Sequence, residues 1–282
     1  MNAAATERRR GLPHALQALG AIVARELLKF SRQYGRLASA LVRPLLWLAV
    51  FAAGFRNVFG VAIVEPYDTY VPYDVYIAPG LVGMVLLFNG MQSSLAMVYD
   101  REMGLMRLLL TAPLPRWWIL ASKLTATAVL SLAQAAAFVI VAALLGTTLP
   151  VFGAQTPHVL LAAVAAALML GALGLLLSVH IKQLENFAGT MNFVIFPMYF
   201  LSTALYPLWK LEESGARWVY EVARFNPFTH AVEWMRFALY GKDPGVAPWV
   251  VIGTLVACFA LAVWGYDPQR GFGALAKRGA PN

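Results

Sequence analysis

The side chains that could bind a metal ion or act as a catalytic base are few in this sequence and lie far apart. It contains four histidines and one cysteine among 282 residues. No histidine lies at metal-ligand spacing from another histidine, the cysteine or a carboxylate. Cys258 lies inside an apolar run, and we interpret it as a packing residue. The pattern therefore predicts no metal site and no catalytic residues. The histidines are His14, His158, His180 and His230.

Nucleotide chemistry is also missing from the sequence. A G-x-x-x-x-G-K-[ST] motif, whose backbone amides cradle phosphates in a Walker A loop, does not occur. The chain is therefore not expected to bind ATP or Mg²⁺ itself. The chain itself is not expected to be an enzyme.

Charged side chains do gather in one short segment, residues 99–118. The spacing predicts a helix over Arg101–Leu110, which the two following prolines end because proline lacks an amide hydrogen and clashes with the preceding turn. In the first turn of such a helix the Glu102 carboxylate would be favoured by the helix dipole. A plain interfacial connector is the alternative. The residues singled out are Arg101, Glu102, Gly104, Arg107, Leu109, Pro113 and Pro115.

Long apolar runs position this segment. The chain is 60% hydrophobic and 13% charged, whereas soluble domains have about 25% charged residues. About 20 apolar residues in a helix cross a bilayer. We therefore expect an all-α polytopic membrane protein with six transmembrane helices, none of which contains Asp or Glu. Their approximate bounds are 37–55, 76–98, 119–145, 158–179, 187–205 and 246–266.

The runs divide the chain into three parts. Residues 1–36 form an N-terminal part in which Pro13–Arg36 reads as an amphipathic helix. One of its faces is apolar and another is basic, which is typical of a helix that lies on an anionic leaflet. Packing of this helix on a partner is the alternative. Residues 37–266 form the transmembrane domain, and residues 267–282 form a tail.

The net charge of +8 comes mainly from Lys and Arg before and between the apolar runs. That distribution is typical of a protein that faces anionic lipid, and it argues against nucleic acid as a partner. Arg43 lies inside the first run, from which its side chain can snorkel to the interface. The positive-inside rule predicts that both termini are cytoplasmic, in a bacterial inner membrane.

A second capped helix is expected between the last two runs. Asn226 is a good N-cap, Pro227 suits the first helical position, and Gly241 suits the position after the end. Within it, Glu233 and Arg236 can pair along the helix.

Two ordered motifs resemble those of ABC-2 type exporter permeases, and the resemblance covers nearly the whole chain. The first is Arg101-Glu102-x-Gly104, then Leu109, Pro113-Leu114-Pro115 and Lys123, although Leu105 and Ser122 replace the usual Thr and Gly. The second runs from Phe196-Pro197 through Tyr206-Pro207 and Asn226-Pro227 to Arg236 and Gly241. Within the family, the motifs look most similar to those of the drug, lipo-oligosaccharide and Nod-factor exporter subgroup.

The resemblance implies a type V exporter architecture and specific roles. The N-terminal amphipathic helix would be the connecting helix, and Arg101–Leu110 the coupling helix that sits on a separate ABC ATPase subunit. His180, Lys182 and Glu185 would form a second cytoplasmic contact. The segment 206–245 would hold re-entrant helices at the outer face. A second copy, or a related permease, would complete the pathway.

The resemblance also guides the expected substrate. Asn89, Asn192, Phe193 and Phe196 are the candidate pathway residues. Polar side chains within the runs are few, which favours an amphipathic, lipid-like, glycolipid or drug substrate over ions. Two other functions stay open on the residues alone: a membrane scaffold or assembly subunit without transport, and a solute channel.

Overall fold

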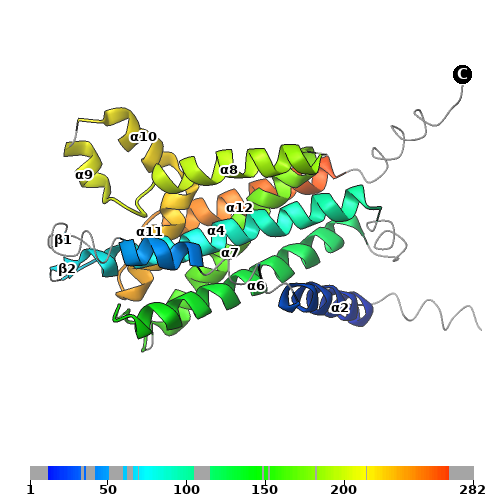
Figure 1. Ribbon diagram of the computed structural model, residues 1–282, viewed down its shortest axis with the longest axis horizontal. Coiled ribbons are helices and arrows are strands. Elements are labelled where there is room, and N and C mark those ends of the chain that lie inside the picture. Colours follow the sequence, from blue (N-terminus) through cyan, green and yellow to red (C-terminus); the bar gives the residue numbers. More distant parts are fainter. Residues whose placement is uncertain are drawn as a thin grey trace, which may run out of the picture.

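The computed structural model describes residues 12–32, 35, 42–50, 60–61, 66–68, 70–104, 115–147, 149–151, 153–181, 183–213 and 215–266. They form a helical bundle with one small antiparallel ribbon, in which β1 (Gly60–Val61) pairs with β2 (Val71–Pro72) (Figure 1). The helices are α2 (Leu12–Ser31), α4 (Tyr73–Glu102), α6 (Arg116–Leu144), α7 (Thr156–His180), α8 (Leu184–Phe200), α9 (Leu208–Glu213), α10 (Arg217–Phe225), α11 (Pro227–Leu239) and α12 (Ala247–Gly265). Residues 42–50 are also helical.

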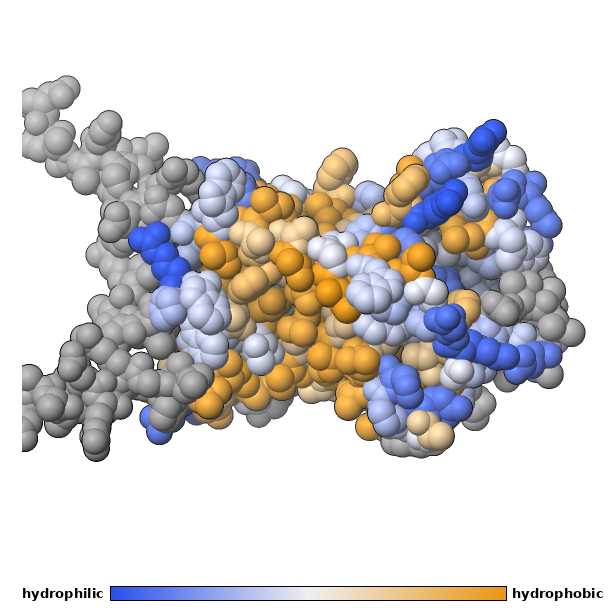
Figure 2. Space-filling view, turned by 180° about the vertical axis from the view of Figure 1, so that it is seen from behind, coloured by the Kyte–Doolittle hydropathy of each residue, from blue (hydrophilic) through white to orange (hydrophobic). Residues whose placement is uncertain are grey.

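Four of these helices, α4, α6, α7 and α12, are long and apolar enough to cross a membrane. Helix α8, with 17 residues, is shorter than the roughly 20 that a perpendicular crossing takes. The first expected run is described only over 42–50. Figure 2 shows a broad band of apolar side chains across the middle of the face in view, with hydrophilic side chains gathered toward its ends. The all-α membrane protein is therefore confirmed, and the count of six spans stays a prediction.

Helix α4 lies at the centre and packs against α6, α7, α8 and α11. Its approach to α7 depends on small residues. A Cβ atom built on Gly174 of α7 would lie 2.7 Å from Ser94 Oγ and 2.9 Å from Gly90 O, both on α4. Without side chains at these positions the two backbones can pack closely, as small residues permit in membrane helices.

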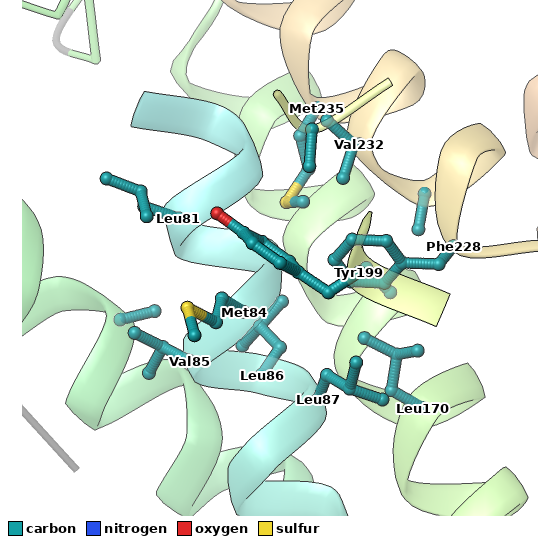
Figure 3. Packing of buried hydrophobic residues seen from close by; sticks show 14 of the residues in the cluster. Leu81, Met84, Val85, Leu86, Leu87, Leu170, Tyr199, Phe228, Val232 and Met235 are labelled. Carbon is teal, nitrogen blue, oxygen red and sulfur yellow. The ribbon is translucent and has the colours of Figure 1, made fainter. Parts of the chain in front are cut away.

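The core lies where α4, α7, α8 and α11 meet. Figure 3 shows Leu81, Met84 and Leu87 of α4 beside Tyr199 of α8 and Phe228 of α11. All of them are buried. Helix α11 contributes the buried residues Ala231, Val232 and Met235, which recur at helical spacing and so form the apolar face that turns inward.

The start and end of α11 follow from its caps. The Asn226 side chain accepts a hydrogen bond from Phe228 N at 3.0 Å, Pro227 occupies the first turn, and Gly241 has φ +66° just beyond the helix. The Asn226 amide also donates to Met198 O at 2.8 Å and to Leu201 O at 2.7 Å. One side chain therefore begins α11 and holds it to the end of α8.

One expectation about α4 was wrong. The helix extends beyond the expected span 76–98 at both ends, so it includes Asp74 and Asp100, both buried, and the span bounds themselves stay a prediction. Arg101 and Glu102 are its last residues and do not open a separate helix. Glu102 therefore lies at the end of the α4 dipole that disfavours a carboxylate, and its role must come from another contact.

Candidate functional site: the α2 end of the bundle and the helix 42–50 groove

The end of the bundle near α2 brings together the last turn of α4 and the turn between α7 and α8. Arg101 Nη1 donates to Ser178 O at 3.0 Å, and its Nη2 donates to Ile181 O at 2.6 Å. These carbonyls belong to the C-terminal turn of α7, where backbone oxygens have no partner within the helix. Arg101 therefore acts as a side-chain cap for α7.

The neighbouring residue makes the complementary contact to α8. Leu184 N, the first amide of α8, donates to Glu102 Oε1 at 3.0 Å. A carboxylate is favoured at a helix N-terminus because the first amides are unpaired and the dipole is positive there. The pair Arg101–Glu102 thus fixes the end of α7 and the start of α8 to the same turn of α4. We call these residues and the 178–184 turn the α4–α8 clamp.

The other predicted residues of this region fall around the clamp. Gly104 has φ +72° and closes the turn after α4, and Pro115 directly precedes α6. His180 ends α7 with Nδ1 2.9 Å from Leu176 O, and Glu185 lies in the first turn of α8. Arg107, Leu109, Pro113 and Lys182 lie outside the described residues. The clamp thus joins the two segments that the sequence analysis treated as separate cytoplasmic contacts.

A charge cluster beside the clamp was missed by the sequence analysis. Asp100, with a side chain only 1% exposed, lies 3.1 Å from Lys29 Nζ and 3.5 Å from Lys123 Nζ. Arg25 is 4.0 Å from the same carboxylate, and Glu26 is 3.8 Å from Lys123 Nζ. A buried carboxylate is costly without counter-charges, so these contacts attach α2 to α4 and α6.

This cluster corrects the expected orientation of α2. The basic face of this helix, expected to rest on lipid, includes Arg25 and Lys29, and both of these side chains turn toward Asp100. On the apolar side, Ile22 is buried and α2 packs along α6, whereas Leu16 is exposed. Helical spacing alone cannot separate a lipid-facing cation from one paired to a buried carboxylate on another helix. Lys123, a lysine near the start of an apolar run, was the one sequence feature that could have indicated a buried charge cluster.

The four candidate pathway residues lie on two different surfaces. Asn89 is buried and its Nδ2 donates to Ser131 Oγ of α6 at 3.0 Å. Asn192 is exposed on α8, and Phe193 beside it is 80% exposed. Among these four residues, Phe196 connects the two regions, because its ring meets that of Phe88 edge-to-face with centroids 6.3 Å apart. The set is therefore not one continuous lining within this chain.

A cation that the sequence analysis assigned to the interface lies at this junction. The Arg43 guanidinium carbon is 4.0 Å from the centroid of Phe88, near the middle of α4. Arg43 therefore does not snorkel away from the bundle. A charged side chain at the centre of a membrane costs about 2.5–3.5 kcal/mol on insertion scales, and a desolvated cation–π contact returns about 2 kcal/mol. The net free energy of placing Arg43 there stays unfavourable unless another group binds its guanidinium.

At the opposite end, Arg236 holds α11 to α4. It is 2% exposed, and its Nη2 donates to Thr203 O at 2.9 Å and to Tyr76 O at 3.4 Å. Its guanidinium lies 4.1 Å from the Tyr76 ring centroid, and Nη1 pairs with Glu233 as the sequence predicts. In the adjoining loop, burial raises the pKa of the Tyr67 phenol above its usual range, and Arg236 partly opposes this shift. This arrangement is a structural junction that joins α11 to α4 and to the segment after α8.

Comparisons with known proteins agree with the membrane architecture. The profile of the family described as "ABC-2 type transporter" matches residues 17–240. The chain is 30% identical over 233 residues to a Porphyra purpurea protein named "Putative transport permease ycf38", covering 81% of this chain and 76% of that protein. It is also 30% identical over 228 residues to the Cyanophora paradoxa protein of the same name, covering 79% of this chain and 74% of that protein.

Proposed function

This chain belongs to the ABC-2 type transporter family, and from that premise we propose that it is the transmembrane permease subunit of an ATP-driven exporter. ATP and Mg²⁺ are bound and ATP is hydrolysed by a separate ABC ATPase subunit, because this chain has no Walker A loop. The α2 end of the bundle faces the cytoplasm and the ATPase docks there. The α9–α11 end faces outward.

The observation that carries this proposal is the α4–α8 clamp. Arg101 donates to Ser178 O at 3.0 Å and to Ile181 O at 2.6 Å, at the end of α7. Glu102 accepts a hydrogen bond from Leu184 N at 3.0 Å, at the start of α8. A partner that moves the turn after Glu102 therefore acts on α4, α7 and α8 together. That is what coupling of ATP hydrolysis to movement of the bundle requires, since a ligand shifts an equilibrium only through contacts that differ between the two states.

The substrate is an amphipathic, lipid-like molecule. The apolar band across the face in view is broad, and few polar side chains interrupt it (Figure 2). A second permease subunit completes the pathway, since α8 leaves Phe193 and Asn192 exposed within this chain. A closed two-fold dimer is the common arrangement for identical subunits.

Purification from native membranes tests the proposal. The tagged chain is solubilised, and co-purifying subunits are analysed for a Walker A peptide and for Mg-ATP hydrolysis. Glu102→Lys should lose the ATPase and the export activity, because a cation replaces the acceptor of Leu184 N. Glu102→Gln keeps a side-chain acceptor, so it should retain both.

Glu213→Lys is the matched control. It makes the same charge reversal at an exposed position of α9, at the opposite end of the bundle (Figure 1). The ATPase should remain bound to this variant. Wild-type recovery of the ATPase with Glu102→Lys would show that the clamp is only a connector. The absence of any co-purifying ATPase from the unmodified chain would contradict the exporter assignment itself.

A further inference from the structure

We propose that Arg43 and Asn89 bind the headgroup of an anionic amphiphile that also carries a hydroxyl or N–H donor. The inference rests on the proposed export function and narrows its substrate class. The site lies in a groove between helix 42–50 and α4, next to Phe196 of α8. Its lining consists of Arg43, Pro44, Met84, Val85, Phe88, Asn89 and Gln92.

The first argument is the unpaired charge of Arg43. No carboxylate of the described part of the chain forms an ion pair with its guanidinium, whose recorded contact is the Phe88 ring. Phe88 is near the midpoint of the 30-residue helix α4, so the cation lies deep in the apolar band. Arginine stays protonated in proteins, and an ionisable group at such depth is expected to have a functional partner. An anionic group is the partner that its charge requires.

The second argument is independent and comes from Asn89. Its Oδ1 is buried and accepts no hydrogen bond from the described part of the chain. The amide orientation is fixed by its neighbour: Ser131 Oγ donates to Thr127 O at 2.8 Å, so it can only accept from Asn89 Nδ2. The free atom of Asn89 is therefore an acceptor. An oxyanion cannot satisfy it, but a hydroxyl or N–H group can.

The enclosed part of the groove admits only a single small group, such as a hydroxyl, and the rest of a headgroup would lie in its open part. The empty space of the groove is about 270 Å³ including the part that opens to the surroundings, and its enclosed part has room for about one water-sized group. Outside the groove a row of aromatic rings continues from Phe88 to Phe196, then to Phe200 and Trp47, with successive centroids 6.0–6.3 Å apart. Phe88 is buried, whereas Phe196 and Phe200 are exposed, so the outer rings of this row offer an apolar surface to the chain of the amphiphile.

Three fluorescent lipids with the same acyl chains separate the two contacts. Phosphatidylglycerol has a charge and hydroxyl donors, phosphatidylmethanol has the charge alone, and diacylglycerol has a hydroxyl alone. Binding to the purified full chain is measured in phosphatidylcholine nanodiscs. Phosphatidylglycerol should bind at least about tenfold more tightly than diacylglycerol, as expected for a hydrogen bond to a charged group.

The variants assign each preference to a residue. Arg43→Gln should remove the preference of both phospholipids over diacylglycerol, and Arg43→Lys should keep most of it. Asn89→Leu should remove only the preference for phosphatidylglycerol over phosphatidylmethanol. Lys242→Gln, which removes an exposed cation outside both the groove and the α2 cluster, is the control and should change none of these ratios. Unchanged ratios in Arg43→Gln, or their loss in Lys242→Gln, would overturn the proposal.

A measurement on the unmodified protein avoids any folding defect of the variants. Phosphatidylglycerol with a diazirine near the headgroup should crosslink to residues 42–50 and 84–92. Crosslinks confined to α2 would overturn the site. Both assays need neither ATPase nor flux. A failed ATPase purification would therefore contradict the export function without affecting the binding result, and an active complex with unchanged lipid ratios would contradict only this inference.

Discussion

The Glu102 carboxylate accepts a hydrogen bond from the backbone amide of Leu184 at 3.0 Å, across 82 residues of sequence. This contact gives a C-terminal residue of α4 the role of an N-terminal cap for α8. Together with the Arg101 contacts to α7, it holds the end of α7 and the start of α8 against the last turn of α4. Motion at this turn cannot be confined to α4 without breaking these bonds.

The charge cluster predicts that Asp100 holds α2 in place. Asp100→Asn leaves Lys29 and Lys123 without their buried counter-charge, and it should destabilise the attachment of α2 by about 1–3 kcal/mol. The cost is below that of a fully buried pair because Lys29 is 31% exposed. Tryptic cleavage at Arg25 and Lys29 should become faster. Asp243→Asn, in an exposed turn, is the control and should be cleaved at the wild-type rate.

The close approach of α4 and α7 predicts a steric effect at Gly174. Gly174→Ala adds a Cβ 2.9 Å from the backbone oxygen of Gly90, which cannot move aside as a side chain can. The variant should lose about 1–3 kcal/mol through overpacking, measured by thermal unfolding in detergent. Gly189→Ala in α8 meets no atom within 4 Å, so its unfolding temperature should not fall. Equal stabilities of the two variants would contradict the proposed contact.

The order of helices and the capping of α11 were predictable because both are local. Asn226, Pro227 and Gly241 act through neighbouring backbone, and apolar periodicity marks the face that turns inward. The longer α4 was not predictable, since Asp100 ends an apolar run by composition. The helix nevertheless continues through Asp100, because Lys29 and Lys123, both distant in sequence, neutralise its carboxylate. Arg43 was misassigned for the same reason: its contact with Phe88 depends on the packing of two helices.

The two functions of Asn226 can be separated by substitution. Asn226→Asp retains the acceptor for Phe228 N but loses the donors to Met198 O and Leu201 O. Asn226→Ala loses both functions, including a cap that contributes about 0.5–2 kcal/mol. If both functions stabilise the fold, unfolding temperatures should fall in the order wild type, then Asp, then Ala. An Asp variant as stable as wild type would show that the contact to the end of α8 contributes nothing.

Topology can be read from labelling of single cysteines in a Cys258→Ala background. Cys258 is partly buried in α12, and its removal leaves no native thiol in the sequence. A membrane-impermeant maleimide added to intact cells should label Glu213→Cys in α9 and should not label Gln183→Cys at the clamp. Permeabilised cells should label both. Labelling of Gln183→Cys in intact cells would invert the proposed orientation and place the ATPase-binding surface on the wrong side.

The last prediction concerns the buried Arg236 junction. Arg236→Met removes the donors to Thr203 O and Tyr76 O and leaves Glu233 without its partner. Removing one member of such a buried pair costs about 3–5 kcal/mol. Arg236→Lys keeps the charge but cannot reach both carbonyls with a planar fork, so it should fall between wild type and Met.

Lys242→Met is the control for Arg236→Met, because it breaks an ion pair with Asp68 that is largely exposed. Such a pair contributes about 0–1 kcal/mol. Thermal unfolding of the three variants in the same detergent gives the comparison, and ATPase recovery in the same preparations gives the second readout. Since the junction lies at the opposite end from the clamp, Arg236→Lys should lower stability while the ATPase stays bound. If Arg236→Met unfolds at the temperature of Lys242→Met, the junction does not hold α11 to α4.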